Sequence, residues 1–350
     1  MNTNHEPIPD EDASGETAQA VSRGKGAGGP TAMRDEFLAL FRDTRLHPPS
    51  GKTASPPEST PENTSRERIP SLPASEPSRF LRRFLQQAAP MPEPASSGLA
   101  GLDDRLGGGL GYGLHLVLGA PGAGKTAFLE SLAWEAVAGQ RPGLYYALKT
   151  GSLRVWERLI ATLGTILDGP GITPSALRGQ ELAPEDAETL GRLDAALQAS
   201  VLPYLSLIDA APASTGSLSA FVEDVRSRGQ EAGEQHGRLP LVLVDDLEAL
   251  VTLTGSRSPL HLLSRINDAL VGDSMPGLLA CAPASPLFAE LERLPVQTVL
   301  ALMPVLPSTT ATSERVDLEV RKNAATGWTG TVPLLLDPWS GLFAEPGAGG

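Results

Sequence analysis

Short apolar runs alternate with longer amphipathic stretches along residues 96–350. Apolar runs of about four to eight residues between glycines or polar residues are typical of buried strands, and apolar residues spaced about 3.6 positions apart are typical of helices. The apolar runs predict strands at 114–119, 143–149, 204–208, 240–245, 277–282, 297–303, 315–321 and 329–336. The amphipathic stretches predict helices at 125–138, 152–164, 184–199, 216–229, 259–271 and near 286–292. Between Gly229 and Pro240 the composition predicts a mobile surface loop.

The order of these elements indicates an α/β fold. Strands that alternate with helices form a mostly parallel sheet, which helices cover on both faces through right-handed crossovers. The last three predicted strands have no helix between them. We therefore expect a three-layer domain whose sheet ends in an antiparallel hairpin at one edge.

The first 95 residues follow neither pattern. They are rich in Pro, Ser, Glu, Thr and Gly, as in HPPSGKTASPPESTPENTSRERIPSLPASEP. Such a composition buries too little apolar surface to offset the entropy of folding, so we predict a disordered extension at 1–95 and a domain at 96–350. Two stretches, about 31–46 and 77–89, place Phe and Leu at helical spacing with arginines on the other face. They are either transient helices in a linker or helices that fold on a protein partner.

Charge and cysteine content limit the possible partners. The chain has a net charge of −13, and residues 1–95, with 11 basic and 13 acidic residues, account for −2 of it. The domain therefore carries −11, and contact with DNA would need a local basic patch. Cys281 is the only cysteine, which excludes an intrachain disulfide and a cysteine-based zinc site. With no signal-peptide core and no apolar run of about 18 residues, we expect a cytoplasmic protein with no membrane partner.

A glycine-rich turn joins the first predicted strand to the first predicted helix. Its sequence, GAPGAGKT at 119–126, fits the pattern G-x-x-x-x-G-K-[ST] in the strand–turn–helix context that a phosphate-binding loop requires. In such a loop, backbone N–H groups surround the phosphates, the lysine reaches the β and γ phosphates, and the hydroxyl ligates Mg²⁺. This predicts binding of ATP and Mg²⁺, with Lys125 as a catalytic residue and Thr126 as a metal ligand. The expected nucleotide-binding residues of the loop are Gly119, Pro121, Gly122, Ala123, Gly124, Lys125, Thr126 and Ala127.

Two carboxylates follow the apolar run at 241–244. A carboxylate at the end of a strand beside the phosphate loop can hold Mg²⁺ through water, so Asp245 is the second predicted metal residue. Some P-loop ATPases place a catalytic carboxylate directly after the metal-holding Asp, and Asp246 occupies that position as a candidate base. It is shorter than the glutamate usually found there.

Residues 96–345 resemble the RecA-like ATPase domain of DnaB-type replicative helicases and, more distantly, RadA and KaiC. SSGLAGLDDRLGGGLGYGLHLVLGAPGAGKTAF is similar to the family's lead-in and phosphate loop, and GLYYALKTGSLRVWERLIATLG to its second strand and the following helix. LSLIDAAPASTGSLSAFVEDVRSR resembles the segment before the Asp245 strand, and VRKNAATGWTGTVPLLLDPWSGLFAE the closing hairpin. The resemblance implies a RecA-like P-loop NTPase fold, a ring of identical subunits, and a role in DNA replication, repair or recombination with possible contact to single-stranded DNA.

Several positions depart from the family's pattern. The family's second strand ends in a glutamate that activates the attacking water, whereas this chain has Lys149, and an ammonium cannot accept a proton. Pro283 falls near a glutamine that senses the γ-phosphate, and Ala324 falls near an arginine that reaches the neighbouring subunit's site. Lys322 matches the family's lysine in the same hairpin, which implies a contact with nucleotide. Because an arginine finger contributes about 10³–10⁵ in rate, we expect weak hydrolysis.

These departures leave two functions open. One is a weakened ATPase of DNA metabolism, in which Asp246 replaces the missing base. The other is a non-hydrolysing ATP-binding scaffold or regulator that recruits a partner through its N-terminal extension. Lys149 is then either a solvated residue at a strand end or a group that neutralises bound phosphate and favours retention over turnover. The loops after Asp246 and Pro283, where the family contacts single-stranded DNA, carry only Arg257 and few aromatic residues, which is little for binding a strand.

Overall fold

The described residues form a fold around one nine-stranded sheet. The computed structural model describes residues 92–168, 177, 184–209, 216–283, 293–305, 314–337 and 340–346. Within them the strand order is β3-β2-β4-β5-β1-β6-β7-β8-β9. The first six strands in this order are parallel, and β7 to β9 are antiparallel, which confirms the mostly parallel sheet and the closing hairpin. The strands are β1 Gly113–Gly119, β2 Gly143–Ala147, β3 Leu205–Asp209, β4 Leu241–Val244, β5 Pro276–Cys281, β6 Thr298–Pro304, β7 Glu314–Asn323, β8 Gly330–Leu336 and β9 Phe343–Ala344.

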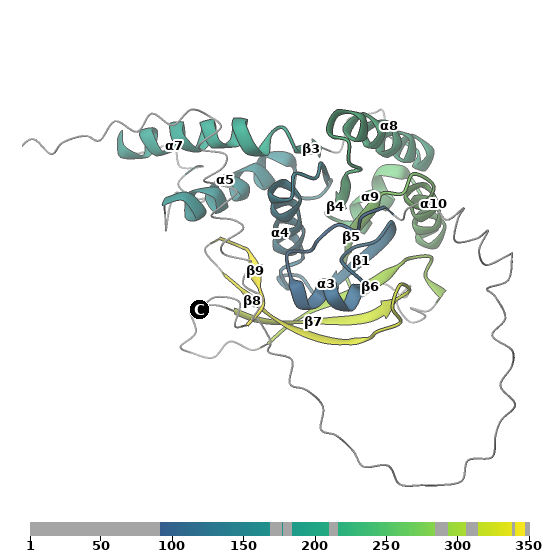
Figure 1. The fold of residues 1–350 in the computed structure, drawn as a ribbon. Helices are drawn as coiled ribbons and strands as arrows, with labels where there is room; N and C mark the ends of the chain where they lie inside the picture. Colours follow the sequence, from purple (N-terminus) through teal and green to yellow (C-terminus); the bar gives the residue numbers. More distant parts are fainter. Residues whose placement is uncertain are drawn as a thin grey trace, which may run out of the picture.

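Helices cover both faces of the parallel strands (Figure 1). Alternate side chains of a strand point to opposite faces, so Val117 of β1 packs in one core with Phe128, while Leu116 packs in the other with Leu263. Helices α4 and α5 lie over the first face, and α8, α9 and α10 lie over the second. The helices are α3 Ala100–Leu106, α4 Lys125–Ala138, α5 Ser152–Asp168, α7 Pro184–Ala196, α8 Leu218–His236, α9 Leu247–Thr254 and α10 Pro259–Gly272, with a π-helical turn η1 at Leu197–Val201. The expected helices near 31–46, 77–89 and 286–292 lie outside the described residues.

The loop predicted between Gly229 and Pro240 is wrong, because α8 continues to His236. Gly229 and Gly233 lowered its apparent helix propensity, but both lie where α8 closely approaches its neighbours. A Cβ at Gly229 would clash with the sulfur of Met275, and one at Gly233 would lie 3.3 Å from Leu239. The glycines therefore let α8 approach its neighbours closely and do not end the helix.

Three short elements were not predicted from the sequence. Helix α3 has seven residues, and its first amides are held by a carboxylate from the far end of the chain: Gly101 and Leu102 donate to Glu345 at 3.0 and 3.1 Å. Helix α9 has eight residues, and two residues, Asp245 and Asp246, separate it from the end of β4. Strand β9 has two residues. Elements of this length depend on tertiary contacts more than on local pattern.

The polar segment before the domain joins the fold at residues 93–95. Ala95 exchanges backbone hydrogen bonds of 2.8 Å with Leu110, and the buried guanidinium of Arg141 donates to the carbonyls of Glu93 and Pro94 at 2.8 and 3.0 Å. Burial lowers the pKa of Arg141 to about 10, which still leaves it charged at neutral pH. These contacts hold residues 93–95, the end of the predicted extension, against the fold.

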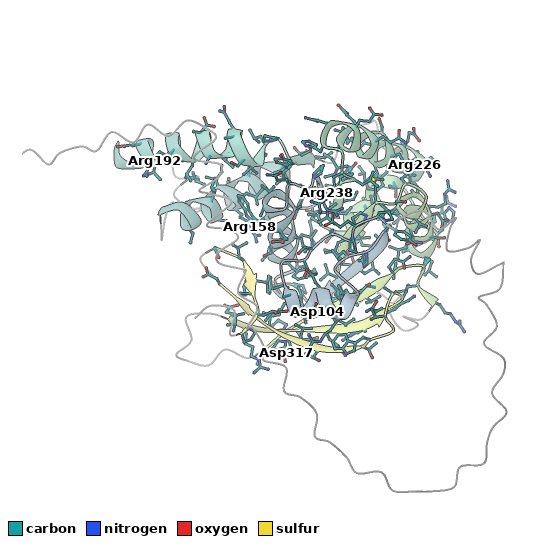
Figure 2. All side chains as sticks on the ribbon, in the orientation of Figure 1. Asp104, Arg158, Arg192, Arg226, Arg238 and Asp317 are labelled. Carbon is teal, nitrogen blue, oxygen red and sulfur yellow. The ribbon has the colours of Figure 1, made fainter. Side chains whose placement is uncertain are left out.

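Charged side chains on and beside the helices pair with one another. Figure 2 marks Arg226 on α8, which pairs with Asp273 just after α10 at 2.9 Å, and Arg238, which pairs with Glu93 at 2.6 Å. None of the helices in the described residues is long and apolar enough to cross a membrane.

Candidate nucleotide-binding site

The glycine-rich turn has the geometry of an anion site. It follows the end of β1 at Gly119 and leads into α4 at Lys125. Gly122 and Gly124 have φ angles of +81° and +90°, which side-chain-bearing residues rarely adopt. No side chain caps the start of α4, and its first turn contains no acidic residue. The first amides of the helix and the positive end of its dipole therefore remain available for phosphate oxygens.

Lys125 folds back over this turn. Its Nζ donates to the carbonyl oxygens of Gly119 at 2.5 Å and Ala120 at 3.1 Å. Partial burial lowers its pKa; the positive charge of Lys149 lowers it further, and the carboxylates of Asp246 and Glu248 oppose the shift. These charged groups therefore act on one another around the phosphate loop.

Asp245 lies at the end of β4, but its carboxylate is already engaged. Oδ1 accepts hydrogen bonds from the amides of Leu148 at 2.8 Å and Lys149 at 3.1 Å, and Oδ2 accepts from Lys149 at 3.2 Å and Thr150 at 2.9 Å. Strands β2 and β4 are parallel neighbours, so the turn after β2 lies beside the end of β4. The carboxylate thus holds the turn at 148–150, and direct ligation of a metal would require these hydrogen bonds to break.

Asp246 is also committed to two contacts. Its Oδ1 accepts from the amide of Ala249 at 2.8 Å and caps α9, and its Oδ2 lies 2.7 Å from Nζ of Lys149. The Asp246 side chain is 6% exposed and that of Lys149 is 68% exposed. The hydrogen bond and charge of Asp246 raise the pKa of Lys149. The candidate base is therefore paired with a cation, the exposed ammonium of Lys149.

The described residues offer few protein ligands for a metal ion on its own. Among the described residues, no group of three or more His, Cys, Asp or Glu side chains could hold a metal ion. Mg²⁺ is commonly held by one or two protein oxygens together with phosphates and water. Thr126, in the first turn of α4, is placed for such a role, whereas Asp245 could act only through water or after rearrangement.

Lys322 lies at the opposite end of the sheet from the phosphate loop of its own chain. It pairs with Val299 of β6, whereas Gly119 pairs with Leu302, three residues further along that strand and therefore about 10 Å away. Its Nζ donates to the carbonyl of Leu294 at 2.7 Å. The structure therefore does not bring Lys322 to the nucleotide site of the same chain, and a contact with a neighbouring subunit's nucleotide stays a prediction.

The hairpin after Lys322 is fixed to α3. Asn323 and Thr326 donate to the carbonyl of Arg105 at 3.0 and 2.8 Å, and the Arg105 guanidinium lies 5.1 Å from the ring centroid of Trp328. Trp328 packs, partly buried, against the first core.

Sequence reasoning missed the C-terminal residues that support the phosphate loop. The Phe343 ring packs edge-on against Phe128 with centroids 5.6 Å apart, and its amide donates to Ser131 at 3.2 Å. A Cβ on Gly124 would lie 3.2 Å from the same ring. No local signal marks this contact, because it joins α4 to a segment more than 200 residues away.

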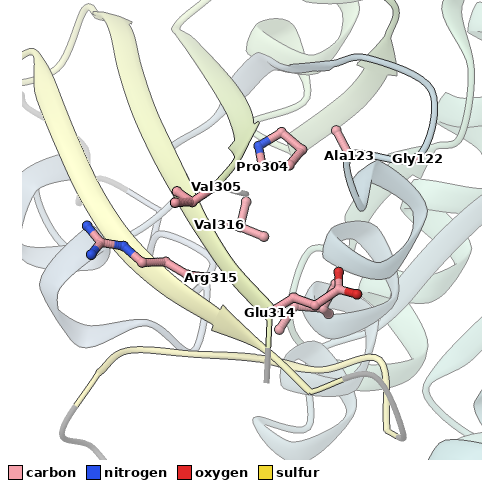
Figure 3. A pocket seen from close by; sticks show the side chains of 8 residues that line it. Gly122, Ala123, Pro304, Val305, Glu314, Arg315 and Val316 are labelled. Carbon is pink, nitrogen blue, oxygen red and sulfur yellow. The ribbon is translucent and has the colours of Figure 1, made fainter. Parts of the chain in front are cut away.

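A pocket of 110 Å³ opens beside the phosphate loop (Figure 3). The end of β6, the start of β7 and the end of β8 form its other walls, which are mainly apolar. In Figure 3 the charged ends of Glu314 and Arg315 extend in different directions. The lining residues are Gly122, Ala123, Pro304, Val305, Glu314, Arg315, Val316 and Leu336.

Comparison with solved structures identifies the fold class of this chain. No family model matches the sequence, and no curated protein matches it. A solved DnaB-like replicative helicase, described with its interactions with primase, is similar with a TM-score of 0.56 and 18% identity over 76% of this chain and 65% of the helicase chain. A second solved structure, described as an ATPase domain, is similar with a TM-score of 0.56 and 19% identity over 76% of this chain and 96% of that domain. This chain thus spans less than two thirds of the helicase but nearly all of an ATPase domain. Its described residues have the RecA-like fold of DnaB-like helicase ATPase domains.

Proposed function

We propose that this protein binds ATP with Mg²⁺ at the phosphate loop and acts in DNA metabolism as a RecA-like P-loop ATPase with weakened hydrolysis. The uncapped start of α4, together with Lys125, carries the proposal for nucleotide binding. The similar folds of the replicative helicase and of the solved ATPase domain support the assignment to DNA replication, repair or recombination. The pocket lined by Gly122 and Ala123 lies beside the phosphate loop and would hold part of the nucleoside.

Each residue of the site has a defined task in this proposal. The amides of the loop bind the phosphates, and Lys125 exchanges the carbonyls of Gly119 and Ala120 for phosphate oxygens. Mg²⁺, when bound with ATP, neutralises phosphate charge and orients the γ-phosphate. Thr126 is the proposed direct ligand, and Asp245 holds the turn that presents Lys149.

Weak hydrolysis follows from the state of Asp246. A general base must accept a proton from water, and an ion pair with Lys149 plus a cap contact leaves this carboxylate little capacity to do so. The same observation favours the second candidate, an ATP-binding scaffold or regulator that does not hydrolyse ATP and recruits a partner through its N-terminal extension. Steady-state phosphate release with and without single-stranded DNA separates the two. Turnover stimulated by DNA supports the ATPase, and binding without turnover supports the scaffold.

Ring formation is part of the proposal for the ATPase. In a ring of identical subunits, the hairpin that carries Lys322 would meet the neighbour's phosphates. Light scattering with and without ATP tests this point, and a protein that stays monomeric with ATP bound contradicts the ring.

Replacing Lys125 by alanine is expected to weaken ATP binding about 10-fold to 100-fold, because a charge-assisted hydrogen bond to phosphate is lost. Equilibrium titration with labelled ATP measures the change. Arg228→Ala removes one positive charge on α8, where the side chain pairs with Asp224, and serves as the control. Equal affinities of Lys125→Ala and the unmodified protein would refute the site.

A further inference from the structure

The two side chains of the Lys149–Asp246 ion pair differ in their freedom to move. Asp246 is buried and held on its other oxygen by the cap contact with Ala249. The Lys149 side chain is 68% exposed, and among the described residues Asp246 is the carboxylate that it bonds. A long, exposed lysine side chain can change partners at little cost, whereas the carboxylate cannot leave.

The backbone that carries Lys149 is held firmly. Asp245 accepts hydrogen bonds from three successive amides of the turn, including that of Lys149 itself. The side chain therefore moves from a fixed Cα at the carboxyl ends of the parallel strands, where the phosphate loop also lies. Its reach is that of an extended lysine, about 6 Å.

The charges around the phosphate loop already interact with Lys149. The pKa of Lys125 is lowered by the positive charge of Lys149, second only to the effect of burial. The two ammonium groups repel each other as long as no anion lies between them. A triphosphate bound at Lys125 supplies that anion.

We propose that Lys149 is a γ-phosphate ligand, which leaves Asp246 when a nucleoside triphosphate binds and returns to it when a diphosphate is bound. The inference rests on the proposed function, because it assumes a nucleotide at the phosphate loop. A γ-phosphate offers several oxygens and about two negative charges to an ammonium, against one carboxylate oxygen in the ion pair. With a diphosphate the pair stays closed. Lys149 thereby gives the site a preference for triphosphate and uncovers Oδ2 of Asp246 only in the triphosphate state.

Replacing Lys149 by methionine tests the assignment. Competition titrations with ADP and the non-hydrolysable analogue AMP-PNP, both with Mg²⁺, give the ratio of the two dissociation constants. We expect Lys149→Met to weaken AMP-PNP binding about 10-fold or more and to change ADP binding less than about 2-fold. Equal changes for both nucleotides, or no change for either, would overturn the assignment.

A second variant removes the competing partner instead. Asp246→Ser keeps a good cap residue for α9 but cannot form the ion pair, so Lys149 is released and AMP-PNP affinity is expected to rise while ADP affinity does not. Unchanged AMP-PNP affinity in this variant would also count against the proposal. Arg228→Met matches the charge change of Lys149→Met at a distant helix, and thermal unfolding checks that each variant is folded.

Nucleotide binding and the role of Lys149 can be refuted separately. If the unmodified protein binds neither nucleotide, the proposed function is wrong. If it binds both and the preference for AMP-PNP does not depend on Lys149, only the role of Lys149 is wrong.

Discussion

Replacing Asp245 by asparagine is expected to lower the free energy of unfolding by about 3 kcal/mol, because three amides lose a charged acceptor. The carboxylate accepts from Leu148, Lys149 and Thr150 with both oxygens. An asparagine side chain of the same shape keeps one acceptor oxygen and turns an N–H₂ donor toward the remaining amide donors. Urea unfolding at neutral pH measures the loss, and an unchanged slope confirms that the comparison is of stability alone.

Strand β3, which lies on the other side of β2 from β4, offers a matched control. Asp209 ends β3 and accepts from the amide and the hydroxyl of Ser152, both at 2.6 Å, but its side chain lies at the surface. Water can replace these contacts, so Asp209→Asn is expected to cost less than about 1 kcal/mol. A loss at Asp245 no larger than the loss at Asp209 would show that Asp245 does not hold the turn.

Much of the fold could be predicted because its elements carry local patterns. The strands of the parallel sheet are short apolar runs, and the glycine turn is a contiguous motif of known mechanism. The sequence could not show which strand ends become neighbours. Because β2 lies beside β4, the turn at 148–150 contacts Asp245 and Asp246. The hydrogen bonds of Asp245 and the ion pair of Asp246 with Lys149 are therefore not predictable from sequence motifs alone.

The residues that pack behind the phosphate loop also could not be predicted, because they lie far away in the sequence. Phe343 and Glu345 lie in the last residues of the described chain, yet they contact α4 and the start of α3. An aromatic residue near a terminus carries no signal that identifies its partner. Such contacts form because β7, β8 and β9 extend the sheet and bring the C-terminal segment beside the helices. They become visible only in three dimensions.

The two candidate functions share one structural question, which is whether Asp246 is ever free. In the pair with Lys149 it serves as a cap and a counter-ion. If triphosphate draws Lys149 away, Asp246 keeps its cap contact and gains an oxygen that can accept from water. Retention of ATP by Lys149 and exposure of the Asp246 oxygen to water are then two consequences of the same movement, so any hydrolysis that uses Asp246 as a base occurs only while Lys149 stays on the phosphate.

A carboxyl group is buried inside the domain on helix α4, which begins at Lys125. Glu130 of α4 is buried; its Oε2 lies 2.9 Å from Arg158 of α5, labelled in Figure 2. Its other oxygen, and the hydroxyl of the buried Tyr145, have no hydrogen-bond partner among the described residues. Because Arg158 reaches only one oxygen and is itself partly solvated, burial outweighs the ion pair and raises the pKa of Glu130 to about 8.

Glu130→Gln is therefore expected to change the pH dependence of stability. Between pH 4.5 and about 8 the folded protein binds a proton at Glu130 that the unfolded chain has lost, so stability falls as pH rises through this window. A shift of this size corresponds to roughly 3–5 kcal/mol, which the glutamine variant does not lose. Urea unfolding of both proteins from pH 5 to 9 gives the difference at each pH, and contributions from other groups such as His115 cancel in it. The variant should gain stability relative to the unmodified protein as pH rises; a difference that is constant across the range would mean that Glu130 is ionised throughout and that Arg158 holds it so.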